Sequence, residues 1–408
     1  MRAIAVALAI GTLTACAQVP SEPARDGDAR ARQLAERSLV VDTHIDLPYR
    51  LHKADEAGTD TPPGDFDHSR ALAGGLDAAF MSIYVPAEVD EAGDARAFAE
   101  AAIDRVEGLA GAHTDAYTVA TCTTDVLHAQ AEGLVALPMG MENGGPLAGS
   151  LDALDHFRER GIRYITLAHS RSNHISDSSY DDNERWGGLS PFGRRLIPAM
   201  NERGVLVDVS HLSDDAFWQV LELSETPVLA THSSLRHFTP GFERNMSDAM
   251  VRALGENGGV IQINYGSAFL TEEAQRWGDA LDEAREAYRA EHGLDEDDPR
   301  LDDFAERYRE RNPYPYADLE DVLDHIDRAV GLAGIDHVGI GSDYDGVGDT
   351  LPTGLKDASS YPALVAGLLQ RGYEEGDIAK ILGGNTMRVW RHAEAYAARA
   401  GYPPLCRR

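Results

Sequence analysis

Short apolar runs alternate with longer amphipathic segments along the chain from about residue 38 onward. The apolar runs are brief, several are rich in β-branched residues, and most follow a glycine or another turn-forming residue. These features are typical of buried strands rather than helices. We therefore predict eight strands, at residues 39–43, 76–84, 134–141, 163–168, 205–210, 227–231, 260–264 and 338–342.

The segments between these runs carry the periodicity and the start signals of helices. Residues 94–109 place Ala, Phe, Ile and Val at helical spacing. Residues 319–332 follow Asp318, and residues 213–223 begin with Ser-Asp-Asp, so both have a side chain able to cap the first turn. Strands that alternate with helices predict an α/β fold with a parallel sheet and right-handed crossovers.

Eight such strands favour a closed (β/α)8 TIM barrel, which needs roughly 250 residues plus insertions. The alternative is an open doubly wound sheet, but no G-x-G-x-x-G turn follows the first predicted strand. The chain has 408 residues, 43% hydrophobic and 26% charged, which is ordinary for a globular protein. We assign residues 36–400 to one barrel rather than to two or three domains.

An acidic insertion precedes the last predicted strand. Residues 272–310 hold 15 acidic residues against 6 arginines and have a long polar helical periodicity. We interpret this segment as a solvated pair of helices. A lid or a dimer element over the barrel mouth is the alternative.

The first residues have the pattern of an export signal. Residues 1–15 combine one arginine with an apolar run too short to span a bilayer, and they end Leu13-Thr14-Ala15 before Cys16. This ending resembles the bacterial lipobox, so we predict a lipoprotein signal peptide with Cys16 as the lipidated first mature residue. An ordinary signal peptide is the alternative. Residues 16–35 are polar and contain two prolines and a glycine, from which we predict a flexible tether.

The charge balance limits the partners of the protein. It has 37 Lys and Arg against 68 Asp and Glu, a net charge of −31, which excludes nucleic acid bound through the bulk surface. We expect membrane contact only through Cys16, on an exported protein that faces the periplasm or the exterior. Cys122 and Cys406 could pair in that oxidising setting, but the sequence alone does not establish the pairing.

Candidate chemistry lies where the predicted strands end. Active-site groups of barrels come from the C-terminal ends of the strands. Six of the eight predicted strands end on ionisable side chains, which a buried apolar strand does not need for packing. The residues at these ends are His44 and Asp46, Glu142, His169, His211, His232 and Asp343.

Their types and spacing indicate a metal site. His44 and Asp46 are two residues apart on one strand and therefore point the same way. Histidines and carboxylates without thiolates suit Zn²⁺, Mn²⁺ or a similar ion. Adding Glu142, His211 and His232 gives five ligands, enough for two metals if Glu142 bridges them. Two metals about 3.5–4 Å apart would hold a hydroxide for metal-assisted hydrolysis.

A set of short motifs follows in order along the chain: DTHID at 42–46, GMENGGPL at 140–147, YITLAHSRSN at 164–173, DVSHL at 208–212, THSS at 231–234, RNMSD at 244–248, GIGSDYDG at 339–346, GLKDASSYPAL at 354–364 and GGNTMRVW at 383–390. This ordered set resembles the membrane (renal) dipeptidase family of zinc peptidases, which belongs to the amidohydrolase-like barrels. The resemblance runs from about residue 36 to 395.

The resemblance implies a role for each matching position. One zinc would be bound by His44, Asp46 and Glu142, and the other by Glu142, His211 and His232. It implies that His169 stabilises the tetrahedral intermediate, that Arg244 binds the C-terminal carboxylate of the substrate, and that Asp343 carries the proton. Without the resemblance, Arg244 would be taken as a surface residue before a helix.

We therefore predict a zinc-dependent dipeptidase that cleaves dipeptides with a hydroxide held between two metals. The alternatives are another binuclear amide hydrolase, acting on N-acyl amino acids or lactams, and a non-enzymatic lipoprotein that binds peptide or metal. The side-chain preference, a D-residue at the C-terminal position and a homodimer are left open. We assign His174, His237 and His325 to structural or rim roles, and Asp42, Asp208 and Asp345 to the support of the site residues.

Overall fold

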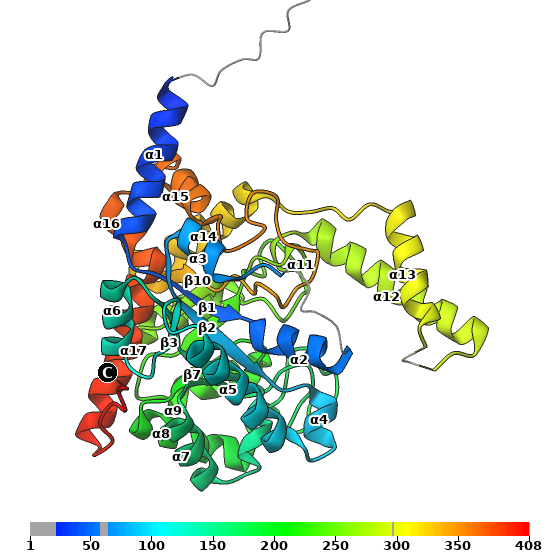
Figure 1. Ribbon diagram of the computed structural model, residues 1–408. Helices are drawn as coiled ribbons and strands as arrows, with labels where there is room; N and C mark the ends of the chain where they lie inside the picture. The colour runs from blue at the N-terminus through cyan, green and yellow to red at the C-terminus, as the bar shows by residue number, and fades with distance from the viewer. Residues whose placement is uncertain (1–21, 58–63, 296–297, 408) are drawn as a thin grey trace, which may run out of the picture.

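The computed structural model describes residues 22–57, 64–295 and 298–407, and helices surround a central parallel sheet (Figure 1). The strands are β1 (Val40–Ile45), β2 (Leu76–Tyr84), β3 (Tyr117–Val119), β4 (Val135–Leu137), β5 (Met139–Glu142), β6 (Ile162–Thr166), β7 (Leu206–Asp208), β8 (Leu229–Ser233), β9 (Val260–Ile263) and β10 (Val338–Ile340).

The sheet closes on itself. The strand order is β1-β10-β9-β8-β7-β6-β5-β2, and β2 pairs in parallel with β1, so every strand position of the ring has two neighbours. An open sheet would leave β1 or β2 at an edge. The structure confirms the predicted (β/α)8 TIM barrel and excludes the doubly wound alternative.

Each predicted strand is found within a few residues of its expected bounds, with one interruption. The third predicted run is divided at Pro138 into β4 and β5, because proline cannot donate to a strand ladder. β4 pairs with β2 and carries the additional short strand β3, so β3 lies outside the barrel ring. β5 continues the ring between β2 and β6.

The helices fill the connections between the strands. They are α1 (Glu22–Arg37), α2 (Leu47–Ala57), α3 (His68–Gly74), α4 (Ala87–Glu91), α5 (Ala95–Ala112), α6 (Thr123–Glu132), α7 (Leu151–Arg160), α8 (Pro191–Arg203), α9 (Asp214–Leu223), α10 (Asp248–Asn257), α11 (Ser267–Leu270), α12 (Glu272–His292), α13 (Arg300–Arg311), α14 (Leu319–Ala333), α15 (Tyr361–Gln370), α16 (Glu375–Ala379) and α17 (Asn385–Arg399). The predicted caps are confirmed: Ser213 accepts from the amide of Ala216, and Asp318 forms a capping box with Asp321.

The N-terminal end of the barrel is packed shut. Inward side chains of the strands, including Phe80 and Tyr164, form a buried cluster with Met387 and Trp390 of α17. The rings of Phe80 and Trp390 lie 5.2 Å apart. This core fills the N-terminal half of the barrel, and the predicted site residues lie at the opposite, C-terminal ends of the strands.

The predicted flexible tether over 16–35 is wrong for the part that the structure describes, because Glu22–Arg37 forms helix α1. Ala31, Leu34 and Ala35 are buried, and α1 packs against α15 (Figure 1). Arg30 also pairs with Glu375 at 3.0 Å. These three apolar residues follow helical spacing, which outweighs the polar composition of the segment. The predicted signal peptide, 1–15, and Cys16 lie outside the described residues.

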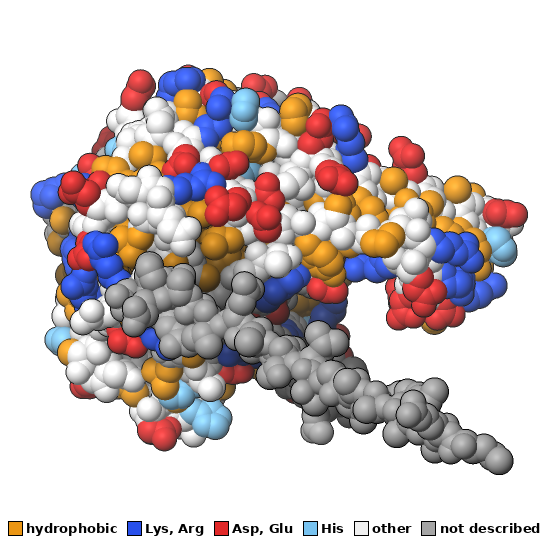
Figure 2. All heavy atoms as spheres, turned by 90° about the horizontal axis from the view of Figure 1, so that it is seen from above, with side chains coloured by type: hydrophobic (Ala, Val, Ile, Leu, Met, Phe, Trp, Pro, Cys, Tyr) orange, Lys and Arg blue, Asp and Glu red, His pale blue; other side chains and the backbone are white. Residues whose placement is uncertain are grey.

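The acidic insertion forms the predicted pair of helices, α12 and α13, which projects from the barrel as an arm (Figure 1). Figure 2 shows acidic, basic and apolar side chains intermixed on its surface. Tyr288 of α12 stacks on Phe304 of α13, with ring centroids 4.7 Å apart. Ala274 and Leu301 are the fully buried residues of these two helices, so the arm is largely solvated.

The C-terminal tail is attached covalently to the barrel. Cys122, at the start of α6, and Cys406 form a disulfide, which settles the pairing left open by the sequence. The amide of Arg407 also donates to Asp125 at 3.0 Å. Within the described part of the chain, none of the helices combines the length and the apolar content needed to cross a membrane.

Candidate active site

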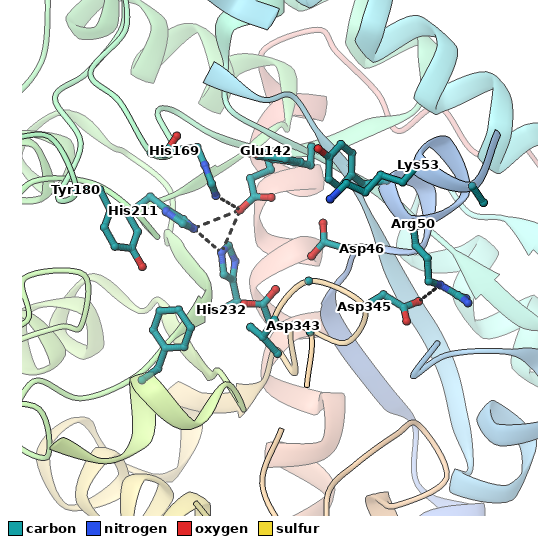
Figure 3. Close-up of a pocket in the computed structure, with 18 residues that line it drawn as sticks. Asp46, Arg50, Lys53, Glu142, His169, Tyr180, His211, His232, Asp343 and Asp345 are labelled. Atoms are coloured by element: carbon teal, nitrogen blue, oxygen red, sulfur yellow. Dashed lines mark hydrogen bonds and ion pairs between the residues drawn. The ribbon is translucent and has the colours of Figure 1, made fainter. Parts of the chain in front are cut away.

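The predicted site residues converge at the C-terminal end of the barrel, and those that line the pocket there are drawn in Figure 3. His44 lies in β1, Glu142 ends β5 and His232 lies in β8. Asp46 directly follows β1, and His211 lies three residues after the end of β7. All five side chains are buried. Strands that are far apart in the sequence thus supply one cluster of nitrogen and oxygen ligands.

Glu142 occupies the centre of this cluster. Its Oε1 lies 3.2 Å from Nε2 of His211 and 3.2 Å from Nε2 of His232. Its Oε2 lies 3.4 Å from Nε2 of His44, and this same nitrogen is 3.4 Å from Oδ2 of Asp46. The two oxygens of one carboxylate therefore face two different groups of ligands, the arrangement required of a bridging ligand.

The donor set fits a divalent metal. Nε2 of His44 is buried and has no hydrogen-bond partner among the described residues, although it faces carboxylate oxygens. Burial lowers the pKa values of His211 and His232 well below the usual value, so both are neutral, the form that binds metal. Histidine and carboxylate donors without thiolate match zinc or manganese.

The ring of His44 is oriented by Tyr164, which sequence analysis did not assign a role. The hydroxyl of Tyr164 donates to the carbonyl of Thr43 at 3.1 Å and lies 2.9 Å from Nδ1 of His44. Since its only proton is used on the carbonyl, the hydroxyl accepts from Nδ1–H and leaves Nε2 directed at the cluster. Gly140 makes this possible, because a Cβ there would meet the Tyr164 ring at 1.9 Å.

His232 is oriented in the same way. The hydroxyl of Thr231 donates to Asp208 at 2.7 Å and lies 2.9 Å from Nδ1 of His232, so it accepts from that nitrogen. Asp208 also accepts from the amides of Ser210 and Thr231. It therefore joins the ends of β7 and β8 and acts on His232 through Thr231. On β1, Asp42 accepts from the amides of His44 and Ser342 and from Tyr361.

The substitution Tyr164→Phe tests this orientation. We expect it to weaken metal binding by about 10- to 100-fold, because the Nδ1 partner of His44 is lost while the packed ring remains. Competition with a chromophoric chelator measures the affinity. Tyr396→Phe, which removes an exposed hydroxyl bonded to Glu225, is the control. Unchanged affinity in Tyr164→Phe would show that Tyr164 does not orient the ligand.

Asp343 lies beside the cluster and is held by Asn264. Its Oδ1 is 4.0 Å from Nε2 of His44, and its Oδ2 accepts from Nδ2 of Asn264 at 2.8 Å. Burial raises the pKa of Asp343 to about 7, within the range suited to a group that takes up and releases protons. Gly346 allows the close approach, since a Cβ there would lie 2.4 Å from Oδ1 of Asp343.

Two site residues have backbone conformations that most side chains avoid. His211 has a φ of 69° and Asp343 a φ of 64°, both in the left-handed region. Such conformations cost about 1–3 kcal/mol and cluster at functional sites. Here they turn the chain in the loops that follow β7 and β10, so that both side chains reach the cluster.

His169 and Arg244 lie on the same side of the cluster as His211. Nε2 of His169 is 3.6 Å from Oε1 of Glu142, and its ring packs against Tyr84 at 4.7 Å. Burial lowers the pKa of His169, so it is a neutral hydrogen-bond donor at the cavity wall.

Arg244 is buried, with 3% of its surface exposed, and is thus no surface residue. Its guanidinium donates to the carbonyl of His232 at 2.6 Å and to Ser233 at 3.0 Å, and it lies 3.1 Å from Nε2 of His211. Its Nε has no partner, and no carboxylate of the described residues lies within ion-pair distance. A buried cation of this kind favours an anionic ligand.

A cavity of about 840 Å³ opens over the cluster; His169 lines it, whereas Arg244 does not. It is large enough for a small ligand. None of the described residues of the arm lines it, so the arm does not form a lid in this structure. The lining residues are Asp46, Tyr49, Arg50, Lys53, Ala54, Tyr84, Glu142, His169, Ser170, Tyr180, His211, His232, Phe269, Asp343, Asp345, Gly346, Val347 and Gly348.

Several supporting residues differ from expectation. Asp345 does not orient Asp343; it pairs with Arg50 at 3.0 Å and accepts from the amide of Asp65. Asn264 holds Asp343 instead. Asn264 ends the seventh predicted strand, and the strand-end rule would have found it had neutral polar residues been included. His325 is structural as predicted, since it bonds the amide of Leu235 and lies 3.0 Å from the carbonyl of Leu270.

A parallel barrel with five buried His and carboxylate donors at its C-terminal face defines the class of metal-dependent hydrolases. Residues 28–403 match the family described as membrane dipeptidase (peptidase family M19). The chain belongs to this family. Membership confirms the family predicted from the motifs and, with it, the class of reaction, metal-dependent hydrolysis of dipeptides.

Individual relatives agree with this assignment. The chain is 32% identical over 342 residues to the dipeptidase tcpJ of Claviceps purpurea, covering 82% of this chain and 71% of that protein. The solved structure of the probable dipeptidase PvdM of Pseudomonas aeruginosa superimposes with a TM-score of 0.78 at 30% identity, over 91% of this chain and 100% of the other. A metallopeptidase of Rhodobacter sphaeroides, bound to a phosphinate mimic of L-Ala-D-Ala, has a TM-score of 0.70 at 25% identity, over 87% and 99%.

Proposed function

We propose that this protein is a dipeptidase with two zinc ions, one held by His44, Asp46 and Glu142 and the other by Glu142, His211 and His232. The observation that carries the proposal is the placement of Glu142. Its Oε1 faces His211 and His232, and its Oε2 faces His44. A single catalytic zinc would take only three protein ligands, so two of these five side chains would not bind metal.

The two ions, when bound, would supply Lewis acidity toward the peptide carbonyl and acidify a water molecule. The protein supplies the remaining chemistry. Asp343 accepts the proton released by the attacking water and returns it to the leaving amine. His169 donates a hydrogen bond to the oxyanion that develops on the carbonyl.

Arg244 would bind the C-terminal carboxylate of the substrate. A buried guanidinium with a free Nε can form a two-point contact with a carboxylate. A peptide extended at its C-terminus would place an amide at this position, so the clamp requires the residue after the scissile bond to be the last residue of the substrate. The phosphinate mimic of L-Ala-D-Ala bound by the Rhodobacter relative supports acceptance of a D-residue at the C-terminal position.

We also propose that the protein is exported and anchored by lipid at Cys16. The lipobox-like ending of residues 1–15 supports this. The disulfide between Cys122 and Cys406 adds support, because such bonds persist in oxidising compartments and are rare in the cytosol. A homodimer remains a prediction.

Two sets of substrates test the activity and the role of Arg244. The first set contains free L,L and L,D dipeptides, and the second contains the same dipeptides with the C-terminal carboxylate converted to an amide; both are given to the zinc-loaded protein. We expect the free dipeptides to be hydrolysed and the amides to be poor substrates. Arg244→Met should lower kcat/KM for dipeptides on the order of 100-fold, mainly through KM, because a charged hydrogen-bonded pair is lost. Arg252→Met, on the exposed side of α10, is the matched control.

Three outcomes would contradict these assignments. Dipeptide turnover by Arg244→Met with little rise in KM would show that the arginine is no carboxylate clamp. Hydrolysis of N-acyl amino acids or lactams, with no free dipeptide cleaved, would favour the alternative binuclear amide hydrolase. If nothing is hydrolysed, only a binding function remains.

A further inference from the structure

The cavity has two chemically different sides. Tyr180 and Phe269 line one side, and Phe269 lies over the guanidinium of Arg244, 5.3 Å from its ring centroid. The opposite side is formed by α2, which contributes Tyr49, Arg50 and Lys53. Figure 3 shows Glu142 between the two sides, with Tyr180 and His211 on one and Lys53 and Arg50 on the other.

Lys53 is one of the few lysines of the protein, and it lines the cavity. The chain has only three lysines, at positions 53, 356 and 380. Lys53 is exposed to the cavity, and its Nζ lies 5.1 Å from the ring centroid of Tyr49, within the range of a cation–π contact. In Figure 3 its side chain reaches from α2 toward Asp46 and Glu142.

The charged residues near Lys53 on α2 pair with residues other than Lys53. Arg50 pairs with Asp345 at 3.0 Å, so it is not the cation available to a ligand. Asp55 pairs with Arg105 at 3.2 Å, and Glu56 lies 3.3 Å from His52. In the described ranges no carboxylate lies within ion-pair distance of Lys53. The charge of Asp46 is directed to the metal cluster in the proposed function.

The position of Arg244 determines which part of the substrate faces Lys53. With the C-terminal carboxylate on the Arg244 side and the scissile carbonyl over Glu142, the N-terminal residue extends toward α2. We propose that Lys53 makes the enzyme prefer dipeptides whose N-terminal residue carries an acidic side chain, an inference that rests on the proposed dipeptidase activity. An ion pair in a partly enclosed cavity is screened less than one on an open surface.

Matched substrates that differ by one charge test the proposal. Glu-Ala and Gln-Ala have nearly the same shape, and the ratio of their kcat/KM values isolates the charge. We expect the zinc-loaded enzyme to prefer Glu-Ala by about 5- to 10-fold at low ionic strength, and less at high salt. Ala-Glu and Ala-Gln, which carry the charge on the C-terminal residue, should show no such dependence on Lys53.

Substitutions at Lys53 should move this ratio. In Lys53→Met the ratio of kcat/KM for Glu-Ala to that for Gln-Ala should be close to one. In Lys53→Glu the ratio should fall below one, and Lys-Ala should become a better substrate than Gln-Ala. Lys380→Met is the matched control, because Lys380 pairs with Asp336 just before β10, at the opposite end of the barrel. It should keep the wild-type ratio.

The outcomes separate the two proposals. Equal hydrolysis of Glu-Ala and Gln-Ala by the wild-type enzyme, or a preference that survives in Lys53→Met, overturns the role of Lys53 and leaves the dipeptidase function intact. If neither these nor any other dipeptide is hydrolysed, the proposed function fails and the role of Lys53 fails with it.

Discussion

The substitution Glu142→Gln is expected to lower kcat/KM for dipeptides by on the order of 10³-fold and to reduce the zinc content from two ions to one or none. Oε1 and Oε2 of Glu142 face different histidines, so in the proposed two-zinc site this one side chain serves both metal positions. A glutamine has the same shape but no negative charge, and its NH₂ group cannot coordinate a metal. The measurements are dipeptide kinetics and the zinc content of the dialysed protein.

The control for this variant is Glu222→Gln, on the exposed surface of α9. It should keep full activity and full zinc content. Circular dichroism would establish that Glu142→Gln is folded, which we expect because the amide can still accept from Ser82, now 3.1 Å from Oε2. Two zinc ions per chain in Glu142→Gln would rule out the bridging role.

The substitution Asp343→Asn is expected to have a different effect. It should lower kcat by about 10²- to 10⁴-fold, with KM changed only a few-fold and the zinc content retained. The asparagine can still accept the hydrogen bond from Asn264, but it cannot take a proton from the attacking water. Steady-state kinetics with a dipeptide, together with zinc content, separate this result from that of Glu142→Gln.

The matched control is Asp349→Asn, a neighbouring acid on the loop after β10 that bonds Tyr316 at the surface. It lies outside the cavity wall and should leave kcat unchanged. A kcat for Asp343→Asn close to that of the wild type would mean that another group carries the proton.

The clustering of the candidate metal ligands was predictable from the sequence because of how parallel strands are arranged. Strands of a barrel end at the same face, so ionisable residues at the ends of apolar runs meet there whatever their separation along the chain. His44 and His232 are 188 positions apart, yet their rings stack at 3.7 Å. Element order and strand ends were therefore sufficient, without knowledge of exact bounds.

Residues 22–37 are helical rather than flexible because of a packing partner that is distant in the sequence. Prolines, a glycine and many charges suggested a tether, but Ala31, Leu34 and Ala35 lie on one face of a helix. That face is stable only because α15 covers it. A short amphipathic helix is decided by its packing partner, and the partner lies more than 300 residues along the chain.

The sequence by itself determined the barrel, the six strand ends and the five candidate metal ligands, because each follows from a local pattern of apolar and ionisable residues. The tertiary structure alone decided how those ligands are oriented and what surrounds them. Tyr164 reaches His44 because β6 lies in register with Gly140 of β5. Arg244 and Lys53 lie near the same cluster of candidate metal ligands although neither ends a strand. Such contacts depend on strand register and loop path, which are set by packing between distant segments.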